Sequence, residues 1–104
     1  MHNAQENYLS AEKSCQLPVS IIIVNYNAGF LLGRCVKAAI PHVMQLIVVD
    51  NASSDSSLLE LESIVSAKKH LQVIRLNSNI GFAAACNKGL KRSTQPYILF
   101  LNPD

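Results

Sequence analysis

Three short apolar runs of this chain each end in a cluster of polar residues. They are IIIVNYN (21–27), LIVVDNASSD (46–55) and YILFLNPD (97–104). A strand that is apolar at nearly every position is typical of a parallel sheet covered on both faces. Open sheets of this kind bind ligands outside the carboxyl ends of their strands, where these polar clusters would lie. The runs therefore constrain the fold class and indicate a binding edge.

Apolar runs alternate with segments of helical spacing along the chain. We expect strands at 19–24, 46–49, 71–76 and 97–101, and helices at 30–40, 56–69 and 82–91. This alternation predicts βαβ units, and hence a three-layer, Rossmann-like α/β fold with a mostly parallel sheet. Residues 1–16 are polar and are expected to form a flexible tail, which leaves residues 17–104 as one domain.

Several residues predict where the helices begin and end. Pro41 would stop the first helix, and Gly29 is free to take positive φ in the turn before it. Ser57 and Glu60 form an S-x-x-E pattern that is typical of a helix start, while Asp55 offers a competing start. The first helix is therefore bounded at both ends, whereas the start of the second stays open.

The three cysteines, Cys15, Cys35 and Cys86, are an odd number with no short spacing between any two. This excludes a zinc knuckle and a full disulfide framework, and it favours a reducing, cytoplasmic compartment. Cys35 and Cys86 fall on predicted helices, the second of them between Phe82 and Leu90 at intervals of four residues. We interpret both as small core residues rather than nucleophiles.

The composition argues against nucleic-acid binding and against a membrane span. With 49% hydrophobic residues, 15% charged residues and a net charge of +2, the chain has no basic surface of the kind that binds nucleic acid. No apolar run approaches the roughly 20 residues that span a bilayer. We therefore expect no nucleic-acid partner and no membrane-spanning segment in this chain.

In a parallel sheet, the polar residues that follow the strands share one rim. They are Asn25, Tyr26, Asn27, Asp50, Asn51, Ser53, Asp55, Asn79, Gly81, Asn102 and Asp104. A carboxylate can accept the N–H of a base, and a glycine lets main chain approach a ligand closely. A carboxylate can also hold a hard divalent cation, which would neutralise a diphosphate. The rim therefore suits a nucleotide.

Most of these residue types also have a structural explanation, because Asn, Asp, Ser and Gly form turns and helix caps. Ser53, Ser54 and Asp55 can be explained as helix-capping residues, and Asn27 and Asn79, each taken by itself, as turn residues. Asp50 differs. It directly follows a buried strand, and the residues after it already provide a helix cap, so the structure does not require an acid at this position. We interpret Asp50 as functional.

Two common nucleotide-binding motifs are absent. Neither G-x-G-x-x-G nor G-x-x-x-x-G-K-S/T follows the first strand, which argues against dinucleotide-binding Rossmann enzymes and P-loop NTPases.

The order of the motifs that are present resembles a known family. The motifs present are VSIIIVNYN (19–27), VVDNASSD (48–55), NIGFA (79–83) with Asn87, and LNPD (101–104). In this order, residues 18–104 resemble the start of an inverting family 2 glycosyltransferase, in particular its rhamnosyltransferase-like branch. The resemblance implies a GT-A fold whose first half binds a nucleotide-diphosphate sugar.

The resemblance also assigns roles to single residues. The Val24 main chain and Tyr26 would lie at the base, Asp50 would hydrogen-bond it, and segment 79–87 would line the nucleotide pocket. The nucleotide-sugar-binding residues expected in this way are Val24, Tyr26, Asp50, Asn79, Gly81, Asn87 and Asn102.

Residues 102–104 occupy the position of the family's D-x-D motif, where Asp104 would reach a Mg²⁺ or Mn²⁺ ion on the diphosphate. Asn102 replaces the first acid, and one fewer charge should weaken metal binding. The family's general base, which takes the proton of the attacking acceptor hydroxyl, lies well downstream of this motif. No catalytic residue is therefore assigned here, and we expect the 104-residue chain alone not to transfer sugar.

Two functions stay open. One is the donor-binding part of a glycosyltransferase that serves cell-surface polysaccharide synthesis, with a saccharide or lipid-linked acceptor and, for the whole enzyme, a membrane association. The other is a non-catalytic nucleotide-binding or interaction module. A reading frame that continues past Asp104 to a downstream acid would favour the first, and a natural stop the second. In either case the uncharged strand at 97–101 would leave an apolar edge, so we expect self-association through it.

Overall fold

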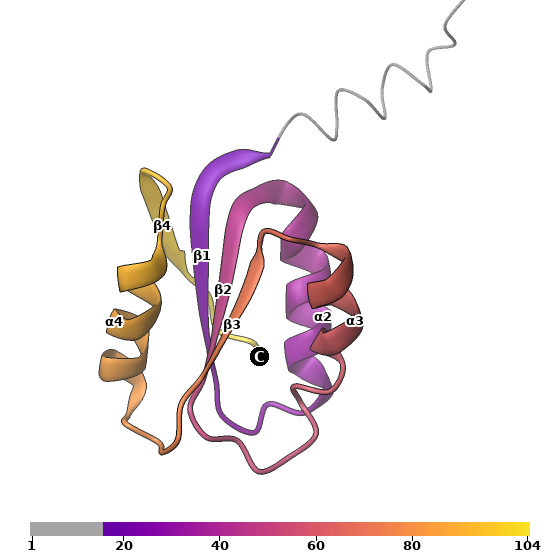
Figure 1. Cartoon of the computed structure of the whole chain (residues 1–104), viewed down its shortest axis with the longest axis vertical. Helices are drawn as coiled ribbons and strands as arrows, with labels where there is room; N and C mark the ends of the chain where they lie inside the picture. Colours follow the sequence, from indigo (N-terminus) through magenta and orange to yellow (C-terminus); the bar gives the residue numbers. More distant parts are fainter. Residues whose placement is uncertain (1–15) are drawn as a thin grey trace, which may run out of the picture.

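A computed structural model describes residues 16–104, in which four parallel strands form one sheet in the order β3-β2-β1-β4 (Figure 1). The elements are β1 (Leu17–Asn25), α2 (Phe30–Ala39), the 3₁₀ helix η1 (Ile40–His42), β2 (Val43–Asp50), α3 (Leu61–Ala67), β3 (Leu71–Arg75), α4 (Phe82–Arg92) and β4 (Tyr97–Phe100). The predicted α/β class with a parallel sheet is confirmed. The predicted tail, residues 1–16, lies outside the described residues except for Gln16, and so does Cys15.

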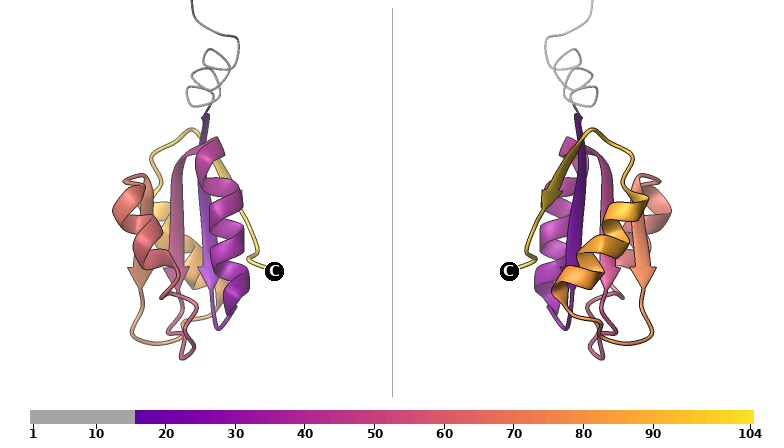
Figure 2. Two further views of the ribbon diagram at one scale, coloured as in Figure 1. Left: turned by 90° about the vertical axis from the view of Figure 1, so that its right-hand side faces the viewer. Right: turned by 90° about the vertical axis from the view of Figure 1, so that its left-hand side faces the viewer.

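Helices cover both faces of the sheet. α2 and α3 lie on one face and α4 on the other (Figures 1 and 2). Ile21 and Ile23 of β1 pack in a buried cluster with residues of α2 and α3, whereas Ile22 packs with Ala85 of α4. Successive side chains of a strand point to opposite faces. Because both faces are covered, the two central strands are apolar at consecutive positions.

α4 lies close to the sheet because Gly89 faces it. A Cβ atom at Gly89 would lie 2.7 Å from Ile22 Cγ2 and 3.1 Å from Val49 Cγ2. Phe82 and Leu90, which form an apolar stripe in the sequence, are instead 65% and 42% exposed. The helix therefore packs through small residues, and its large apolar side chains lie at the surface.

The predicted second helix begins too early. α3 begins at Leu61, and residues 55–60 form bends and turns. The Ser57 hydroxyl donates to Asp55 Oδ1 at 2.5 Å, and Glu60, at the N-cap position, makes no side-chain capping bond. The predicted S-x-x-E cap is therefore wrong, because its hydroxyl is engaged in the turn that precedes the helix.

Other boundaries differ by a few residues. β2 begins at Val43 instead of residue 46. The first predicted helix ends at Ala39, and Pro41 lies in the first turn of the 3₁₀ helix that follows, where a missing N–H costs nothing. Gly29 has a φ of 60°, as its place in the turn before α2 predicts.

A buried hydrogen-bond network fixes the segment between α4 and β4. The Gln45 side chain of β2 accepts hydrogen bonds from Ser20 Oγ at 2.5 Å and from the Thr94 N–H at 2.9 Å. Its Nε2 donates to the Arg92 carbonyl at 2.9 Å, and Ser20 Oγ accepts from the Gln95 N–H at 3.2 Å. The chain entering β4 is thereby attached to both central strands, which places the residues after β4.

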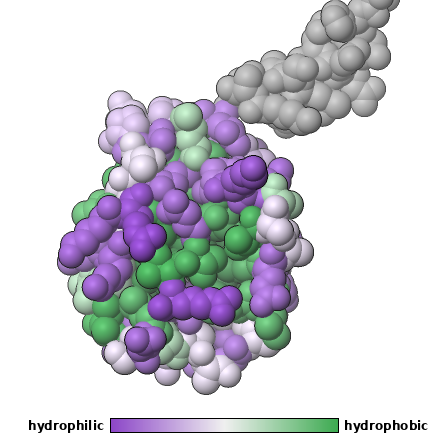
Figure 3. Space-filling model, viewed as in Figure 1, coloured by the Kyte–Doolittle hydropathy of each residue, from purple (hydrophilic) through white to green (hydrophobic). Residues whose placement is uncertain are grey.

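Both outer strands leave apolar side chains at the surface. On the side of β3 and α3, apolar groups form an area bordered by hydrophilic ones (Figure 3). A hollow of about 340 Å³ there is lined by Leu58, Leu61, Glu62, Val65, Val73 and Arg75. On β4, Tyr97, Leu99 and Phe100 are exposed. Within residues 16–104, no helix has the length and apolar composition needed to cross a bilayer.

Candidate functional site

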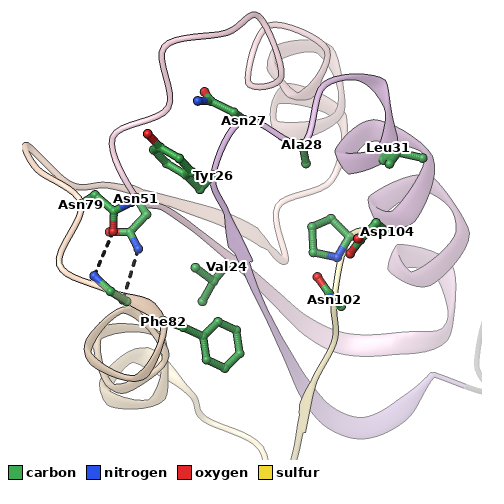
Figure 4. Close-up of a pocket in the computed structure, with 12 residues that line it drawn as sticks. Val24, Tyr26, Asn27, Ala28, Leu31, Asn51, Asn79, Phe82, Asn102 and Asp104 are labelled. Atoms are coloured by element: carbon green, nitrogen blue, oxygen red, sulfur yellow. Dashed lines mark hydrogen bonds between the residues drawn. The ribbon is translucent and has the colours of Figure 1, made fainter.

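Loops at the carboxyl ends of the strands surround a hollow of about 640 Å³ (Figure 4). It is lined by Val24, Tyr26, Asn27, Ala28, Leu31, Asn51, Asn79, Gly81, Phe82, Asn102, Pro103 and Asp104. The predicted site residues among them are Val24, Tyr26, Asn79, Gly81, Asn102 and Asp104. The structure therefore brings together residues that are far apart in the sequence, at the edge where the polar clusters predict a site.

The hollow has two chemically different ends (Figure 4). Tyr26 and Asn51 lie at one end, Asn102 and Asp104 lie at the other, and Val24 lies between them. The Tyr26 side chain is 54% exposed, so a face of its ring is open to a ligand. Asp104 is the one charged residue among the described residues that line the hollow. A ligand with a flat ring at one end and a cation-bound group at the other matches this arrangement.

Hydrogen bonds join the loop after β1 to the loop after β2. Asn27, at a φ of 54°, accepts through Oδ1 from the Ser54 N–H at 2.8 Å and from the Asp55 N–H at 3.2 Å. Asp55 Oδ2 accepts from the Gly29 N–H at 2.9 Å. The hydrogen bond from the Ser57 hydroxyl, followed by bonds from main-chain N–H groups, lowers the pKa of the Asp55 carboxyl. These turn residues therefore shape one wall of the hollow.

Asp50 lies behind this wall and does not line the hollow. Asn25 is fully buried, and its Nδ2 donates to Asp50 Oδ1 at 2.8 Å and to Ser57 Oγ at 2.8 Å. The second carboxylate oxygen of Asp50 accepts from the Ser53 N–H at 3.0 Å, and the residue is 3% exposed. The inference that Asp50 is surplus to structure is therefore wrong, because both its oxygens hold the loop. Its contact with a base stays a prediction.

Asn51, and not Asp50, lines the hollow. Its Nδ2 donates to the Gly81 carbonyl at 3.1 Å, and its Oδ1 accepts from the Ile80 N–H at 2.9 Å. Gly81 has a φ of 87° and a ψ of 167°, a region open essentially to glycine alone. Asn51 belongs to the predicted rim, but no role is assigned to it from the sequence. Its position directly after a buried strand is the sequence signal that could have identified it as a site residue.

Asn87 does not line the main hollow either. It lies on α4 beside a second, largely apolar hollow of about 350 Å³, lined by Phe82, Ala83, Cys86, Asn87 and Phe100. A role for Asn87 in binding stays a prediction. Burial raises the pKa of the Cys86 thiol and of the Cys35 thiol, and both cysteines are free. A raised pKa disfavours the reactive thiolate, which agrees with the interpretation that neither is a nucleophile. Cys35 packs against the larger buried cluster, as expected of a core residue, whereas Cys86 is half-buried and belongs to neither cluster.

Four further lining residues are apolar: Ala28, Leu31, Phe82 and Pro103. Phe82 and Pro103 fall in the predicted segments 79–87 and 102–104, whereas sequence reasoning assigns Ala28 and Leu31 no place in the site. A single apolar residue in a loop or a first helical turn carries no pattern that distinguishes a ligand contact from packing. Only the exposure of Phe82 in the structure shows that its ring is available to a ligand.

The donor set of the hollow fits a divalent cation only in part. Within residues 16–104, no group of three or more His, Cys, Asp or Glu side chains lies close enough to hold a metal ion. Asp104 and Asn102 offer one carboxylate and one carboxamide oxygen. Mg²⁺ is commonly held by one or two carboxylates, with substrate phosphates and water completing the shell. The residues therefore fit a cation that arrives with a phosphate ligand.

Comparison with known proteins decides which family this site belongs to. Residues 20–104 match the family described as Glycosyl transferase family 2. The chain belongs to glycosyl transferase family 2. The resemblance drawn from the four motifs is confirmed at the level of the family, whereas the rhamnosyltransferase-like branch is not.

Curated members of glycosyl transferase family 2 are similar over most of this chain. An uncharacterized glycosyltransferase of Haemophilus influenzae is 33% identical over 89 residues, which cover 83% of this chain and 36% of that protein. The putative teichuronic acid biosynthesis glycosyltransferase TuaG of Bacillus subtilis is 32% identical over 90 residues, covering 83% and 35%. The chain therefore spans about a third of the length of these relatives.

The fold is shared with solved glycosyltransferases. A mannosyltransferase from Pyrobaculum calidifontis, in complex with GDP-Man and Mn²⁺, superimposes with a TM-score of 0.74 at 20% identity. The match covers 86% of this chain and 28% of that one. At this identity the likeness shows the fold alone, and it confirms the GT-A type of architecture expected from the sequence.

Proposed function

We propose that the main hollow binds the nucleoside diphosphate of a sugar donor, and that this chain is the donor-binding part of a glycosyltransferase for cell-surface polysaccharide. The observation that carries the proposal is the two-ended hollow, which pairs an exposed tyrosine ring with a carboxylate at the carboxyl edge of a family 2 sheet. The teichuronic acid biosynthesis relative supports the class of product.

At the ring end, we assign the base to the open face of Tyr26 and to the Val24 main chain, as the resemblance implies. Asn79 and Gly81 form the adjoining wall. Asp50 would reach the base only if the loop that covers its carboxylate moved, since the residue is 3% exposed and lies outside the lining. Binding is therefore proposed to rest on Tyr26 and the loops rather than on Asp50.

At the other end, we assign the diphosphate to Asn102 and Asp104, with a Mg²⁺ or Mn²⁺ ion held by the Asp104 carboxylate. When bound, the cation would neutralise charge on the diphosphate. The complex of the mannosyltransferase with GDP-Man and Mn²⁺ supports a metal of this kind. With a carboxamide at position 102, metal affinity in the absence of nucleotide is expected to be weak.

Sugar transfer itself is proposed to need an acceptor site and a general base that the family resemblance places after residues 102–104. The 104-residue chain is therefore proposed to bind a donor without transferring its sugar. We propose a cytoplasmic location, supported by the free thiols of Cys35 and Cys86. The rhamnosyltransferase-like order of motifs makes a dTDP-linked deoxysugar one of the donors to test.

The test is thermal unfolding of the chain with UDP, dTDP, GDP and CDP, each with and without Mn²⁺. A nucleotide at about ten times its Kd should stabilise the fold by about 1.4 kcal/mol, a shift of several degrees at this size. We expect one base to give this shift and Tyr26→Ala to abolish it. Tyr97→Ala is the matched control, because Tyr97 is also exposed but lies outside the lining.

Two outcomes would contradict the proposal. The first is that none of the four nucleotides shifts the unfolding temperature at millimolar concentration. The second is that Tyr26→Ala and Tyr97→Ala retain the same shift, which would place the base away from the hollow. A shift that needs Mn²⁺ and disappears in Asp104→Asn would support the assignment of the diphosphate end.

A further inference from the structure

The carboxamide of Asn51 continues the pairing of β2 with β3 beyond the end of both strands. The last main-chain bond between these segments runs from the Leu76 N–H to the Asp50 carbonyl at 2.9 Å. After it the chains separate, and the Asn51 side chain spans the gap to the loop before α4. It accepts from the Ile80 N–H at 2.9 Å and donates to the Gly81 carbonyl at 3.1 Å.

This pair of bonds needs an amide. A carboxamide offers an acceptor oxygen and a donor NH₂ group, whereas a carboxylate of the same size offers acceptors only. Asn51 itself is 3% exposed, although both bonds are only partly buried, so a lost bond leaves its own side chain poorly solvated. Aspartate at this position would therefore place a charged oxygen against the Gly81 carbonyl.

The loop held in this way carries part of the hollow. Asn79, Gly81 and Phe82 line it, and α4 begins at Phe82. The same loop contains a second internal bond, from the Gly81 N–H to Asn79 Oδ1 at 2.9 Å. Directly after Asn51, Ala52 has a φ of 63°, a strained value for a residue with a Cβ atom. Strain of this kind persists where the surroundings over-determine the backbone, and it is concentrated at functional sites.

We propose that Asn51 is a positioning residue for nucleotide binding: its carboxamide holds the 79–82 segment in the conformation that completes the ring end of the hollow. The inference rests on the proposed function, since it concerns the same hollow. It goes beyond that function because Asn51 acts through the loop, and because the amide rather than an acid is required.

The test compares Asn51→Asp with the wild type by measuring nucleotide affinity between pH 4.5 and 7.5. The probe is the nucleotide among UDP, dTDP, GDP and CDP that shifts wild-type unfolding. A protonated aspartic acid can donate to the Gly81 carbonyl and accept from the Ile80 N–H, as the amide does. Burial and the facing carbonyl would raise the pKa of this carboxyl, because both disfavour its charged form.

We therefore expect the affinity of Asn51→Asp to approach that of the wild type at pH 4.5 and to be about 10- to 100-fold weaker at pH 7.5. The ratio of the two Kd values is the quantity measured, because titration of the nucleotide phosphate then cancels. Asn77→Asp is the matched control: it adds the same charge at an exposed position of the same loop and should show a constant ratio.

A ratio for Asn51→Asp that stays constant and near one across this range would overturn the proposal. Hydrogen exchange in the wild type gives a second measurement that does not depend on the variant's stability. The Ile80 N–H should exchange more slowly than that of its exposed neighbour Ser78, and equal unprotected rates would also overturn the proposal. If the Ile80 N–H is protected but no nucleotide binds, the proposed function is contradicted. The hydrogen bond from Asn51 to the loop would still be established.

Discussion

Four described residues have positive φ, and all lie in loops around the main hollow. They are Asn27, Gly29, Ala52 and Gly81. Two of them carry a Cβ atom, which makes this conformation costly. The side chain of Asn27 offsets the cost by accepting two main-chain N–H bonds from the next loop. At the scale of single residues, the strained backbone and the hollow therefore coincide, as expected where loop geometry serves binding.

Asp55 provides a pH-dependent test of the bonds between these loops. Its pKa is lowered in the folded protein, chiefly by the Ser57 hydroxyl, so the ionised carboxylate stabilises the fold above the pKa of the unfolded carboxyl, 3.8. This contribution is lost as the pH falls through the lower pKa of the folded state. We expect Asp55→Asn to unfold more easily than the wild type at pH 7, with the difference shrinking below about pH 4.

Urea unfolding of the two proteins from pH 7 to pH 3 measures this difference. Ser54→Ala is a suitable control, because the Ser54 main chain joins Asn27 but its exposed side chain carries no titrating group. A gap between Asp55→Asn and the wild type that is constant down to pH 3 would show that the carboxylate is not responsible.

At the scale of elements, the sequence predicts the strands well and the packing of the helices poorly. β1 and β2 are apolar at consecutive positions, 21–24 and 46–49, because helices cover both faces of the sheet, and this pattern is typical of a buried parallel strand. The face of α4 is different: spacing alone favours Phe82 and Leu90, whereas Gly89 makes the contact. Periodicity counts large apolar residues and cannot detect a close approach through a glycine.

The sequence likewise predicts the location of the site but not which of its residues line it. The rim is predictable because all parallel strands end at one edge. Which of two adjacent polar residues faces the ligand is not, because successive side chains point in opposite directions. Asp50 therefore holds the loop from behind while Asn51 lines the hollow.

The close approach of α4 predicts the effect of one methyl group. Gly89→Ala would bring a Cβ atom within 2.7 Å of Ile22 Cγ2, so the helix must shift away from the sheet. We expect a loss of about 1–3 kcal/mol in the free energy of unfolding, measured in urea. Gly33→Ala is the matched control in α2, because a Cβ there meets chiefly the flexible Glu60 side chain.

Gly33→Ala should be neutral or stabilise by up to about 1 kcal/mol, since alanine favours a helix over glycine. Equal effects of the two substitutions would mean that α4 does not depend on a close contact at Gly89.

At the scale of the whole molecule, the exposed edge of β4 predicts self-association. The strand pairs with β1 on one side only, and Leu99 and Phe100 are 47% and 48% exposed. Unpaired strand edges recruit other chains, and a lysine on the edge prevents this. We therefore expect the chain to form dimers or larger species at high concentration, and Leu99→Lys to return it to the monomer in sedimentation velocity.

Val65→Lys is the control on the opposite side of the molecule, where apolar groups near β3 and α3 also reach the surface (Figure 3). It should leave the association unchanged. Dissociation by Val65→Lys but not by Leu99→Lys would assign the contact to the β3 side, and a wild-type monomer at all concentrations would rule out both.

The hydrogen bonds between the loops have a consequence for how members of this family can diverge. Asn27 is bonded to Ser54 and Asp55, and Asn51 is bonded to Ile80 and Gly81, so three loops that are separate in the sequence depend on one another. A change in one loop alone leaves an unmatched partner in another. Exchange of donor preference between two such proteins would therefore require the three loops to be transferred as a set, while the sheet beneath them could stay as it is.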